Sequence, residues 1–316
     1  MDIWSFSQIE YGEKIRFLLK DKPELKNTDV LIFHNPYDTA LLKWIDKPCL
    51  LYEHRAVRPF TFAWNYEKRA LNPLNAWIKG LDRDKILKFF KKLYQRPDVI
   101  VCNSKFIQGQ LKKWFNVKAF VVNPPVDLEK FKPKKKKREY FLSFQRIDWQ
   151  KRPQIQIEAF MGIKEKLKIV APCANKDLRT KLEYICRRYP NIDFLGEVRE
   201  KELIRLIQGA KAVIQTGIME DFGLVPVESM ACGIPNIVID EAGFKETINR
   251  PELGVRIKKP YIASLRQAIK NFDLSKYDNK VLRKEAQKYG MKRFEKELKK
   301  YIDLAIKRYG NKKSKS

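Results

Sequence analysis

Histidine and cysteine are scarce in this chain of 316 residues. The five cysteines are scattered and show neither a CxxC nor a Cys/His spacing, which argues against a disulfide framework and a zinc site. We expect them to be small buried hydrophobic residues. The two histidines, His34 and His54, are too few for a histidine-rich metal site. These counts argue only against a zinc site and a histidine-rich metal site.

Long apolar runs are also missing. None approaches the roughly 18 residues that are needed to cross a bilayer. The opening Met1-Asp2-Ile3-Trp4 is acidic and aromatic, unlike a secretory signal peptide. These absences lead us to expect a cytoplasmic protein, with the inner face of the membrane as an alternative location.

Acidic residues are outnumbered, because 66 lysines and arginines stand against 38 aspartates and glutamates, a net charge of +28. This excess implies an anionic partner, whether nucleic acid, a phosphorylated substrate or an anionic membrane surface. It is equally typical of the lysine-rich composition of a thermophile, so charge alone does not decide the function. Aromatic residues crowd the first part of the chain among lysines, where they favour a lipid-facing surface and a domain core equally: Trp44, Tyr52, Phe60, Phe62, Trp64, Tyr66, Trp77, Phe89 and Phe90.

Short β-branched runs alternate with longer amphipathic stretches, which is the pattern of an α/β fold. The length of the chain favours two domains. In the first part we expect a helix and four buried parallel strands, the helix over 75–95 and the strands over 30–33, 49–52, 98–102 and 120–122.

Pro124 and Pro125 interrupt regular structure, and a basic run follows them, so we place a domain boundary there. The predicted domains cover residues 1–125, 126–280 and 281–316, the last being a helix and basic tail that packs back towards the first domain. Two doubly wound sheets in sequence would bind ligands at the carboxyl ends of their strands. In the second part we expect strands over 140–144, 168–170, 192–195, 212–215, 236–239 and 255–257, and helices over 154–164, 176–188, 200–209, 225–231, 262–271 and 281–309.

The segment from Glu220 to Gly233 follows a predicted strand and leads into a helix. Gly223 lets the backbone come close to a ligand, and the first amides of the helix are ready for a phosphate group. Glu220 precedes the helix and Glu228 lies one turn inside it, so the two carboxylates can take different hydroxyl pairs of one extended ligand. The alternative is that Glu228 only favours the helix dipole and that Glu220 is a solvated loop residue.

Two cations follow the first strand of the second domain. Arg146 offers a planar fork for phosphate oxygens, and Lys151 offers a point charge. A diphosphate leaving group needs its developing charge neutralised, and two fixed cations can do this without a metal. The alternative is that both are ordinary members of a basic surface.

Taken together, these segments resemble the retaining GT4-type glycosyltransferases of the GT-B fold. The resemblance runs in order through most of residues 98–250 and includes an Arg-x4-Lys pair, the loop Glu-Asp-Phe-Gly-Leu-Val and a glutamate eight positions after its first residue. Four further segments are similar to the family's motifs, at 103–104, 123–131, 231–235 and 241–246.

The resemblance implies two Rossmann-like domains facing a central cleft, the N-terminal one reduced. It implies transfer of a hexose of the mannose or glucose type, from GDP-mannose or a UDP-hexose to a glycan or lipid-linked acceptor, without a metal or other resident cofactor. Arg146 and Lys151 would hold the donor diphosphate, Glu228 the ribose and Glu220 the transferred sugar. The implied catalytic set is Glu220, His54, Arg146 and Lys151, and the implied donor-binding set is Arg146, Lys151, Glu220, Phe222, Gly223, Leu224, Val225 and Glu228.

The first domain carries a second likeness. Residues 51–60 are similar to the Y-x-H-x-P-x-R segment of a subgroup rich in mannosyltransferases. His54 would contact the donor sugar, and the alternative is a capping or half-buried histidine. His34, Arg55 and Arg58 are candidates for the acceptor side.

Two departures from the family pattern stand out. The first strand-like run begins at Val30, so the opening βα unit is expected to be absent or reduced, and Gln145 replaces the glycine that usually precedes the arginine. Alternative functions are a nucleotide-sugar epimerase, a non-catalytic relative and a basic nucleic-acid-binding protein. Carboxylates in the main motif argue against the last, because a phosphate backbone would repel them.

Overall fold

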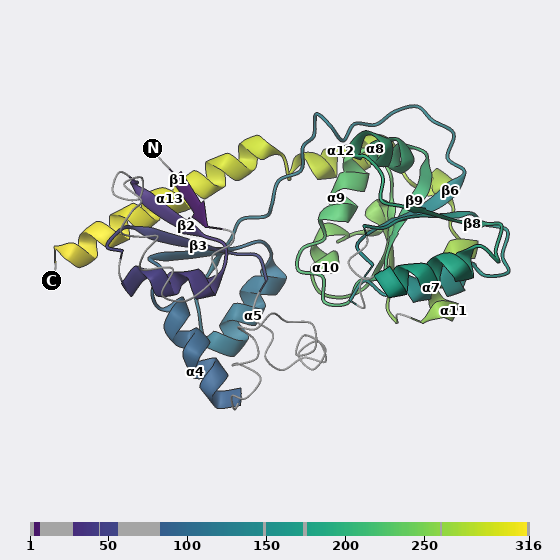
Figure 1. The fold of residues 1–316 in the computed structure, drawn as a ribbon. Helices are drawn as coiled ribbons and strands as arrows, with labels where there is room; N and C mark the ends of the chain where they lie inside the picture. Colours follow the sequence, from purple (N-terminus) through teal and green to yellow (C-terminus); the bar gives the residue numbers. More distant parts are fainter. Residues whose placement is uncertain are drawn as a thin grey trace. The chain divides into compact units, whose positions relative to one another are not determined.

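The structure is a computed structural model that describes residues 3–6, 28–43, 45–55, 83–147, 150–172, 176–259 and 261–314. The chain divides into two compact units. Unit 1 combines Met1–Asn123 with Glu295–Ser316, and unit 2 is Pro124–Phe294. Each unit is built around its own parallel β-sheet (Figure 1). No helix in the described ranges is long and apolar enough to span a bilayer.

Within the described residues, the sheet of unit 1 has five parallel strands in the order β1-β2-β3-β4-β5. The strand sequences are apolar on both faces, as in strands that are covered on both sides. Its elements are β1 Ile3–Phe6, β2 Val30–Phe33, the 3-10 helix η2 Pro36–Lys43, β3 Cys49–Glu53, α4 Arg83–Tyr94, β4 Val99–Cys102, α5 Lys105–Phe115 and β5 Phe120–Val121.

The two faces of this sheet are covered from different parts of the chain. Alternate strand residues, such as Leu31 and Leu51, form one core with α4 and α5. Sequential strands joined by right-handed crossovers place their connecting helices on one face. The helix α13, Met291–Lys313, lies on the opposite side of the sheet from α4 and α5 (Figure 1). Its Ile302 and Ala305 are buried.

Unit 2 has six parallel strands in the order β11-β10-β9-β6-β7-β8. This is the doubly wound arrangement, in which the chain starts at a central strand, builds outward to one edge and then returns to build the other half. Its elements are β6 Tyr140–Phe144, α6 Pro153–Phe160, β7 Leu167–Val170, α7 Lys176–Cys186, β8 Ile192–Gly196, α8 Glu200–Gln208, β9 Ala210–Gln215, α9 Leu224–Ala231, β10 Asn236–Ile239, α10 Phe244–Thr247, η3 Pro251–Leu253, β11 Gly254–Ile257, α11 Ile262–Lys270, η4 Leu274–Lys276 and α12 Asn279–Gln287.

The structure corrects two expectations about the ends of the chain. The opening βα unit is not absent, because β1 pairs in parallel with β2 through Ile3↔Val30 and the three residues that follow each of them. Residues 7–27, which would carry the rest of this unit, lie outside the described part of the chain. The single helix expected over 281–309 is two helices, α12 and α13. Gly290 separates them, since Val126 forms a bridge to it and the Val126 amide donates to the Tyr289 carbonyl at 2.8 Å. Backbone pairing therefore replaces helix where glycine weakens it.

Two further expectations are met only within the described residues. The helix expected over 75–95 is described from Arg83 onward, and residues 75–82 lie outside the described part. Four cysteines, Cys49, Cys102, Cys186 and Cys232, are buried free thiols as expected, and position 173 lies outside the described part.

Candidate functional site

The candidate site of unit 2 lies at the switch point of its sheet, where β6 and β9 are neighbours although the chain continues from each in opposite directions. The loops that follow these two strands are bonded together. Thr216 Oγ1 donates to the Lys151 carbonyl at 2.8 Å, Arg152 Nε donates to the Thr216 carbonyl at 2.8 Å, and the Ile218 amide donates to the Gln150 carbonyl at 2.7 Å. The two predicted segments therefore form one structure.

Lys151 and Glu220 meet within this structure. Lys151 Nζ donates to Glu220 Oε2 at 2.5 Å, and each side chain is 20% exposed. An ammonium group has three N–H donors, so a lysine in this position can bond to a carboxylate and to oxygen atoms of a ligand at the same time. The pair places a cation and a carboxylate side by side at the edge where doubly wound sheets bind ligands.

Backbone conformations around the pair are unusual. Three residues other than glycine have a positive φ here, at 50° for Arg152, 52° for Met219 and 51° for Ala242. Such conformations cost about 1 kcal/mol or more each and gather at functional sites. Glu241 holds the loop by accepting from the Met219 amide at 2.9 Å, and its carboxylate lies 3.9 Å from the Arg152 guanidinium.

The loop from Glu220 to Gly223 is packed against the next turn of the chain. Gly223 has φ 95° and caps α9, and no side chain in the described part of the chain caps the first amides of that helix. Gly243 donates its amide to the Glu220 carbonyl at 2.8 Å, and a Cβ atom there would lie 2.6–2.7 Å from the Phe222 backbone. Glycine at 243 is therefore required for the close approach that holds the loop.

Glu228 lies one turn inside α9 and is half-buried. Burial, with a smaller contribution from the charge of Glu200, raises the pKa of Glu228 to about 7. A displaced pKa caused by desolvation is common at functional sites. This carboxyl group can change its protonation state near neutral pH.

The other predicted donor-side residues divide into exposed and buried. Arg146 lies two residues after the end of β6 and is exposed, and Leu224 is 38% exposed. Val225 is half-buried. Phe222 differs from the expectation for a ligand contact, because its ring is 3% exposed and packs edge-on against Tyr289 in the core. Its side chain anchors the loop, and only its backbone faces the neighbouring turn.

In unit 1 the only two histidines of the chain lie together, at the carboxyl ends of β2 and β3. His34 Nδ1 lies 2.8 Å from His54 Nε2, and the rings stack with centroids 5.0 Å apart. Burial lowers the pKa of His34. Desolvation by the surrounding atoms, followed by the charge of His34, lowers the pKa of His54 to about 4, although part of its side chain remains exposed. Both imidazoles are therefore neutral at pH 7, and one ring donates its N–H to the unprotonated nitrogen of the other.

The surroundings of the histidine pair are fixed by hydrogen bonds. Asn103 Nδ2 donates to the His54 carbonyl at 2.7 Å, and the Tyr52 hydroxyl donates to the Val122 carbonyl at 2.8 Å. Arg55 is exposed, and its amide donates to the buried Glu53 carboxylate at 3.2 Å. Arg58 lies outside the described residues.

Sequence reasoning missed the residues that join the loops. Thr216 accepts from Gln156 Nε2 at 2.8 Å in addition to its bonds to the Lys151 segment. Glu241 and Asn103 were noted only within family-like segments, and their contacts depend on strands that are distant in sequence. The position of Thr216 at the end of a strand next to the switch point is the one signal that could have identified it.

A family model described as "Glycosyl transferases group 1" matches residues 126–293, and one described as "Glycosyltransferase Family 4" matches residues 6–130. The first match covers more than half of the chain. The chain belongs to the group 1 glycosyl transferases. Each unit of this glycosyl transferase lies mainly within one of the two matched regions.

Curated relatives of this glycosyl transferase include two mannosyltransferases. An alpha-1,3/1,6-mannosyltransferase (ALG2) of Rhizomucor pusillus is 22% identical over 306 residues, which is 80% of this chain and 65% of that protein. The O-antigen chain mannosyltransferase RfbU of Salmonella typhimurium is 29% identical over 61% of this chain and 57% of that protein. The chain thus spans less than two thirds of either relative.

Solved structures share the fold over almost the whole chain. Sucrose-phosphate synthase of Thermosynechococcus elongatus superposes with a TM-score of 0.75 at 18% identity, over 92% of this chain and 77% of that one. Anabaena Alr3699/HepE, solved with UDP and glucose, gives 0.72 at 15% identity, over 94% of this chain and 84% of that one. At these identities the likeness establishes the GT-B fold of two α/β domains.

Proposed function

We propose that this protein is a retaining hexosyltransferase that moves a mannose- or glucose-type sugar from GDP-mannose or a UDP-hexose to a glycan or lipid-linked acceptor. The observation that carries the proposal is the Lys151–Glu220 pair at the switch point of unit 2. The family membership and the mannosyltransferase relatives support the same class of reaction.

The donor diphosphate would bind beside α9. Lys151 and Arg146 supply positive charge, and the first amides of α9 after Gly223 supply donors that none of the described side chains occupies. Glu228 would accept hydrogen bonds from the ribose hydroxyls, and Glu220 from hydroxyls of the transferred sugar. A carboxylate suits this role because it accepts from two hydroxyls at once.

The chemical step breaks the bond between the anomeric carbon and the diphosphate oxygen, and an acceptor hydroxyl forms the new bond on the same face. Charge develops on the departing diphosphate, where Lys151 and Arg146 stabilise it without a divalent metal. The acceptor proton passes to a departing phosphate oxygen, so a protein base is not needed. Glu220 keeps Lys151 in place through its 2.5 Å bond.

The histidine pair suits recognition of sugar hydroxyls. Neutral imidazoles both donate and accept hydrogen bonds, and one ring nitrogen of each histidine remains outside the His34–His54 contact. His54 would contact a sugar hydroxyl, and His34, Arg55 and Arg58 would serve the acceptor side. For a lipid-linked acceptor, an anionic membrane surface is the natural partner of the net charge of +28.

The test begins with a thermal-shift screen of GDP-mannose, UDP-glucose and related donors. One donor should raise Tm, and the same donor should be hydrolysed slowly without acceptor. Glu220→Ala should retain part of the Tm shift and lose hydrolysis, because Glu220 contacts the sugar and the diphosphate contacts remain. If no nucleotide sugar raises Tm, the transferase proposal fails.

A further inference from the structure

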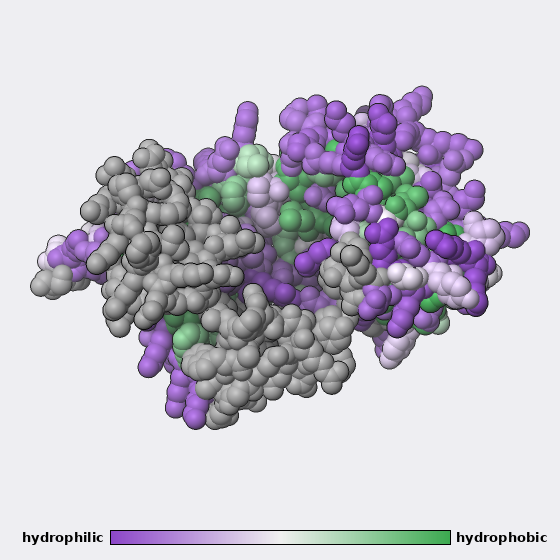
Figure 2. Space-filling model, viewed as in Figure 1, coloured by the Kyte–Doolittle hydropathy of each residue, from purple (hydrophilic) through white to green (hydrophobic). Residues whose placement is uncertain are grey.

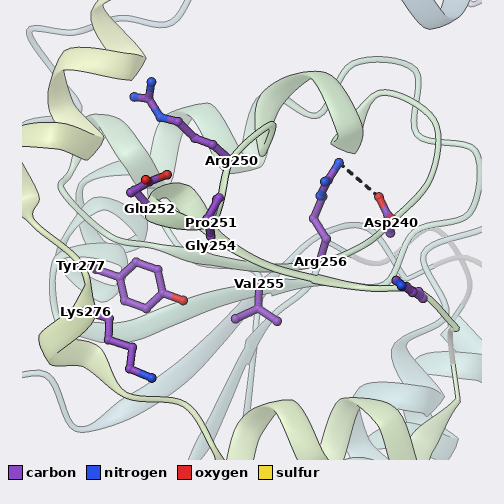
Figure 3. Close-up of a pocket in the computed structure, with 10 residues that line it drawn as sticks. Asp240, Arg250, Pro251, Glu252, Gly254, Val255, Arg256, Lys276 and Tyr277 are labelled. Atoms are coloured by element: carbon purple, nitrogen blue, oxygen red, sulfur yellow. Dashed lines mark ion pairs between the residues drawn. The ribbon is translucent and has the colours of Figure 1, made fainter.

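A second pocket lies in unit 2 along β11, the edge strand of the sheet. It has a volume of about 500 Å³, and Figure 3 shows the residues around it. The proposed donor site described above does not include this pocket. Its lining combines charged with apolar groups and consists of Asp240, Arg250, Pro251, Glu252, Gly254, Val255, Arg256, Lys258, Lys276 and Tyr277.

The charges around the pocket do not balance. Arg250, Arg256, Lys258 and Lys276 line it together with Asp240 and Glu252, which leaves an excess of two positive charges. Among the described residues, neither Lys258 nor Lys276 has an ion pair or a side-chain hydrogen bond, and both are exposed. Such lysines can approach an anion without breaking an existing contact.

The two arginines have partners but keep unused donors. Arg250 Nη2 donates to Glu285 at 2.7 Å, and Lys288 shares that carboxylate. Arg256 Nη1 lies 3.3 Å from Asp240, as the dashed line in Figure 3 shows. A guanidinium group has five N–H donors, so each arginine can also bind a ligand oxygen.

The strand itself contributes a backbone donor. The Asp240 amide donates to the Ile257 carbonyl at 2.9 Å, which turns the peptide groups of Ile257 towards β10. Since alternate residues of a parallel strand bond to opposite sides, the Arg256 amide faces the open edge. On the other wall, the Tyr277 hydroxyl is turned towards β11 (Figure 3).

We propose that this pocket binds the phosphate monoester of a small organic molecule. The excess of two positive charges matches a phosphate dianion, and Pro251, Val255 and Tyr277 provide apolar surface for the rest of the molecule. This pocket is separate from the proposed donor site. The two are adjacent in sequence, because Asp240 lines the pocket and Glu241 accepts from the Met219 amide in the loop that carries Glu220.

The first experiment compares binding of inorganic phosphate, glycerol 3-phosphate and a hexose 6-phosphate by calorimetry at low salt. The second arm identifies the site through protection of Lys258 and Lys276 from acetylation, read by mass spectrometry. We expect at least one ester to bind more tightly than inorganic phosphate and to protect both lysines. A preference for the glycerol ester would indicate a lipid headgroup as source, and a preference for the hexose ester a free sugar phosphate.

Variants separate this site from the donor site. The double variant Lys258→Ala/Lys276→Ala should weaken ester binding about tenfold, by analogy with the loss of charge-assisted hydrogen bonds. Lys112→Ala/Lys118→Ala removes the same charge from exposed positions of unit 1 and should leave binding unchanged. Lys151→Ala should leave ester binding unchanged while it impairs donor binding.

Two results would overturn the assignment. An equal loss in both double variants would mean general attraction to a basic protein. Loss of binding in Lys151→Ala alone would place the phosphate in the donor site. Both outcomes can be read whether or not the hexosyltransferase proposal holds, because they do not depend on turnover.

Discussion

The two units carry different kinds of polar group at the ends of their strands. In unit 2 the site is charged, with a cation and a carboxylate in contact at 2.5 Å and a strained backbone around them. In unit 1 the carboxyl ends of β2 and β3 carry two neutral imidazoles in contact at 2.8 Å. The difference suits phosphate in the first case and sugar hydroxyls in the second, because charge attracts an anion and neutral rings donate and accept.

The largest expected effect concerns the charged site. Lys151→Ala removes the cation that we propose stabilises the departing diphosphate, and it should lower kcat/KM with the preferred donor about a hundredfold or more. Steady-state kinetics measure this effect, with Lys181→Ala on the exposed face of α7 as the control. Activity equal to that of the control would remove Lys151 from the mechanism.

The next effect concerns Glu228 and the pH dependence of unit 2. Its pKa is raised from 4.5 to about 7, so the folded state keeps a proton that the unfolded chain loses between these pH values. This group therefore destabilises the fold as pH rises from 4.5 to 7, and the cost is then constant. Glu228→Gln should stabilise unit 2 by about 2 kcal/mol at pH 8 and by little at pH 4.5.

Hydrogen exchange of α9 and β10 amides in the full chain, corrected for intrinsic rates, measures that difference. The exposed Glu252→Gln is the matched control. A gain that is the same at both pH values would show that Glu228 is not the source of the pH dependence.

A smaller effect of opposite sign is expected in unit 1. The pKa of His54 is lowered from 6.5 to about 4 in the folded state. Between these pH values the unfolded chain therefore binds a proton at His54 that the folded state does not bind. Unit 1 should lose stability as pH falls from 6.5 through 4, by about 1 kcal/mol after allowance for the exposure of the ring.

His54→Gln should reduce this loss, and His34→Gln should reduce it in part, since His34 contributes to the shift. Exchange of β2 and β3 amides provides the measurement. An unchanged acid sensitivity in both variants would contradict a neutral imidazole pair and would remove the contrast between the units.

Much of the fold was predictable because buried parallel strands have short apolar runs as their sequences. The strand at Val30 and the start of α9 near Leu224 were predicted to within one residue for this reason. The family-like motifs identified Lys151 and Glu220 as members of one predicted site. The two side chains are in contact because the strands that precede them, β6 and β9, are neighbours at the switch point. Strand β1 was missed because the polar Ser5 interrupts a run of only four residues.

Other features depend on tertiary contacts that local patterns do not contain. The break at Gly290 exists because Val126 pairs with it, more than 160 positions earlier in the chain. The His34–His54 contact requires β2 and β3 to be neighbours in register. The role of Thr216 depends on the neighbouring loop after β6. In each case the residues in contact lie too far apart in the sequence for a local pattern to reveal the contact.

Helix α13 makes unit 1 discontinuous in sequence. Lys312 Nζ donates to Asp98 Oδ1 at 2.7 Å, Tyr309 donates to Asp46 at 2.7 Å, and the Tyr301 ring stacks on Phe120. During synthesis, residues 124–294 leave the ribosome before these three side chains exist as neighbours for the sheet. Unit 1 therefore cannot be completed until all of unit 2 has been synthesised, and one face of its sheet lacks α13 until then.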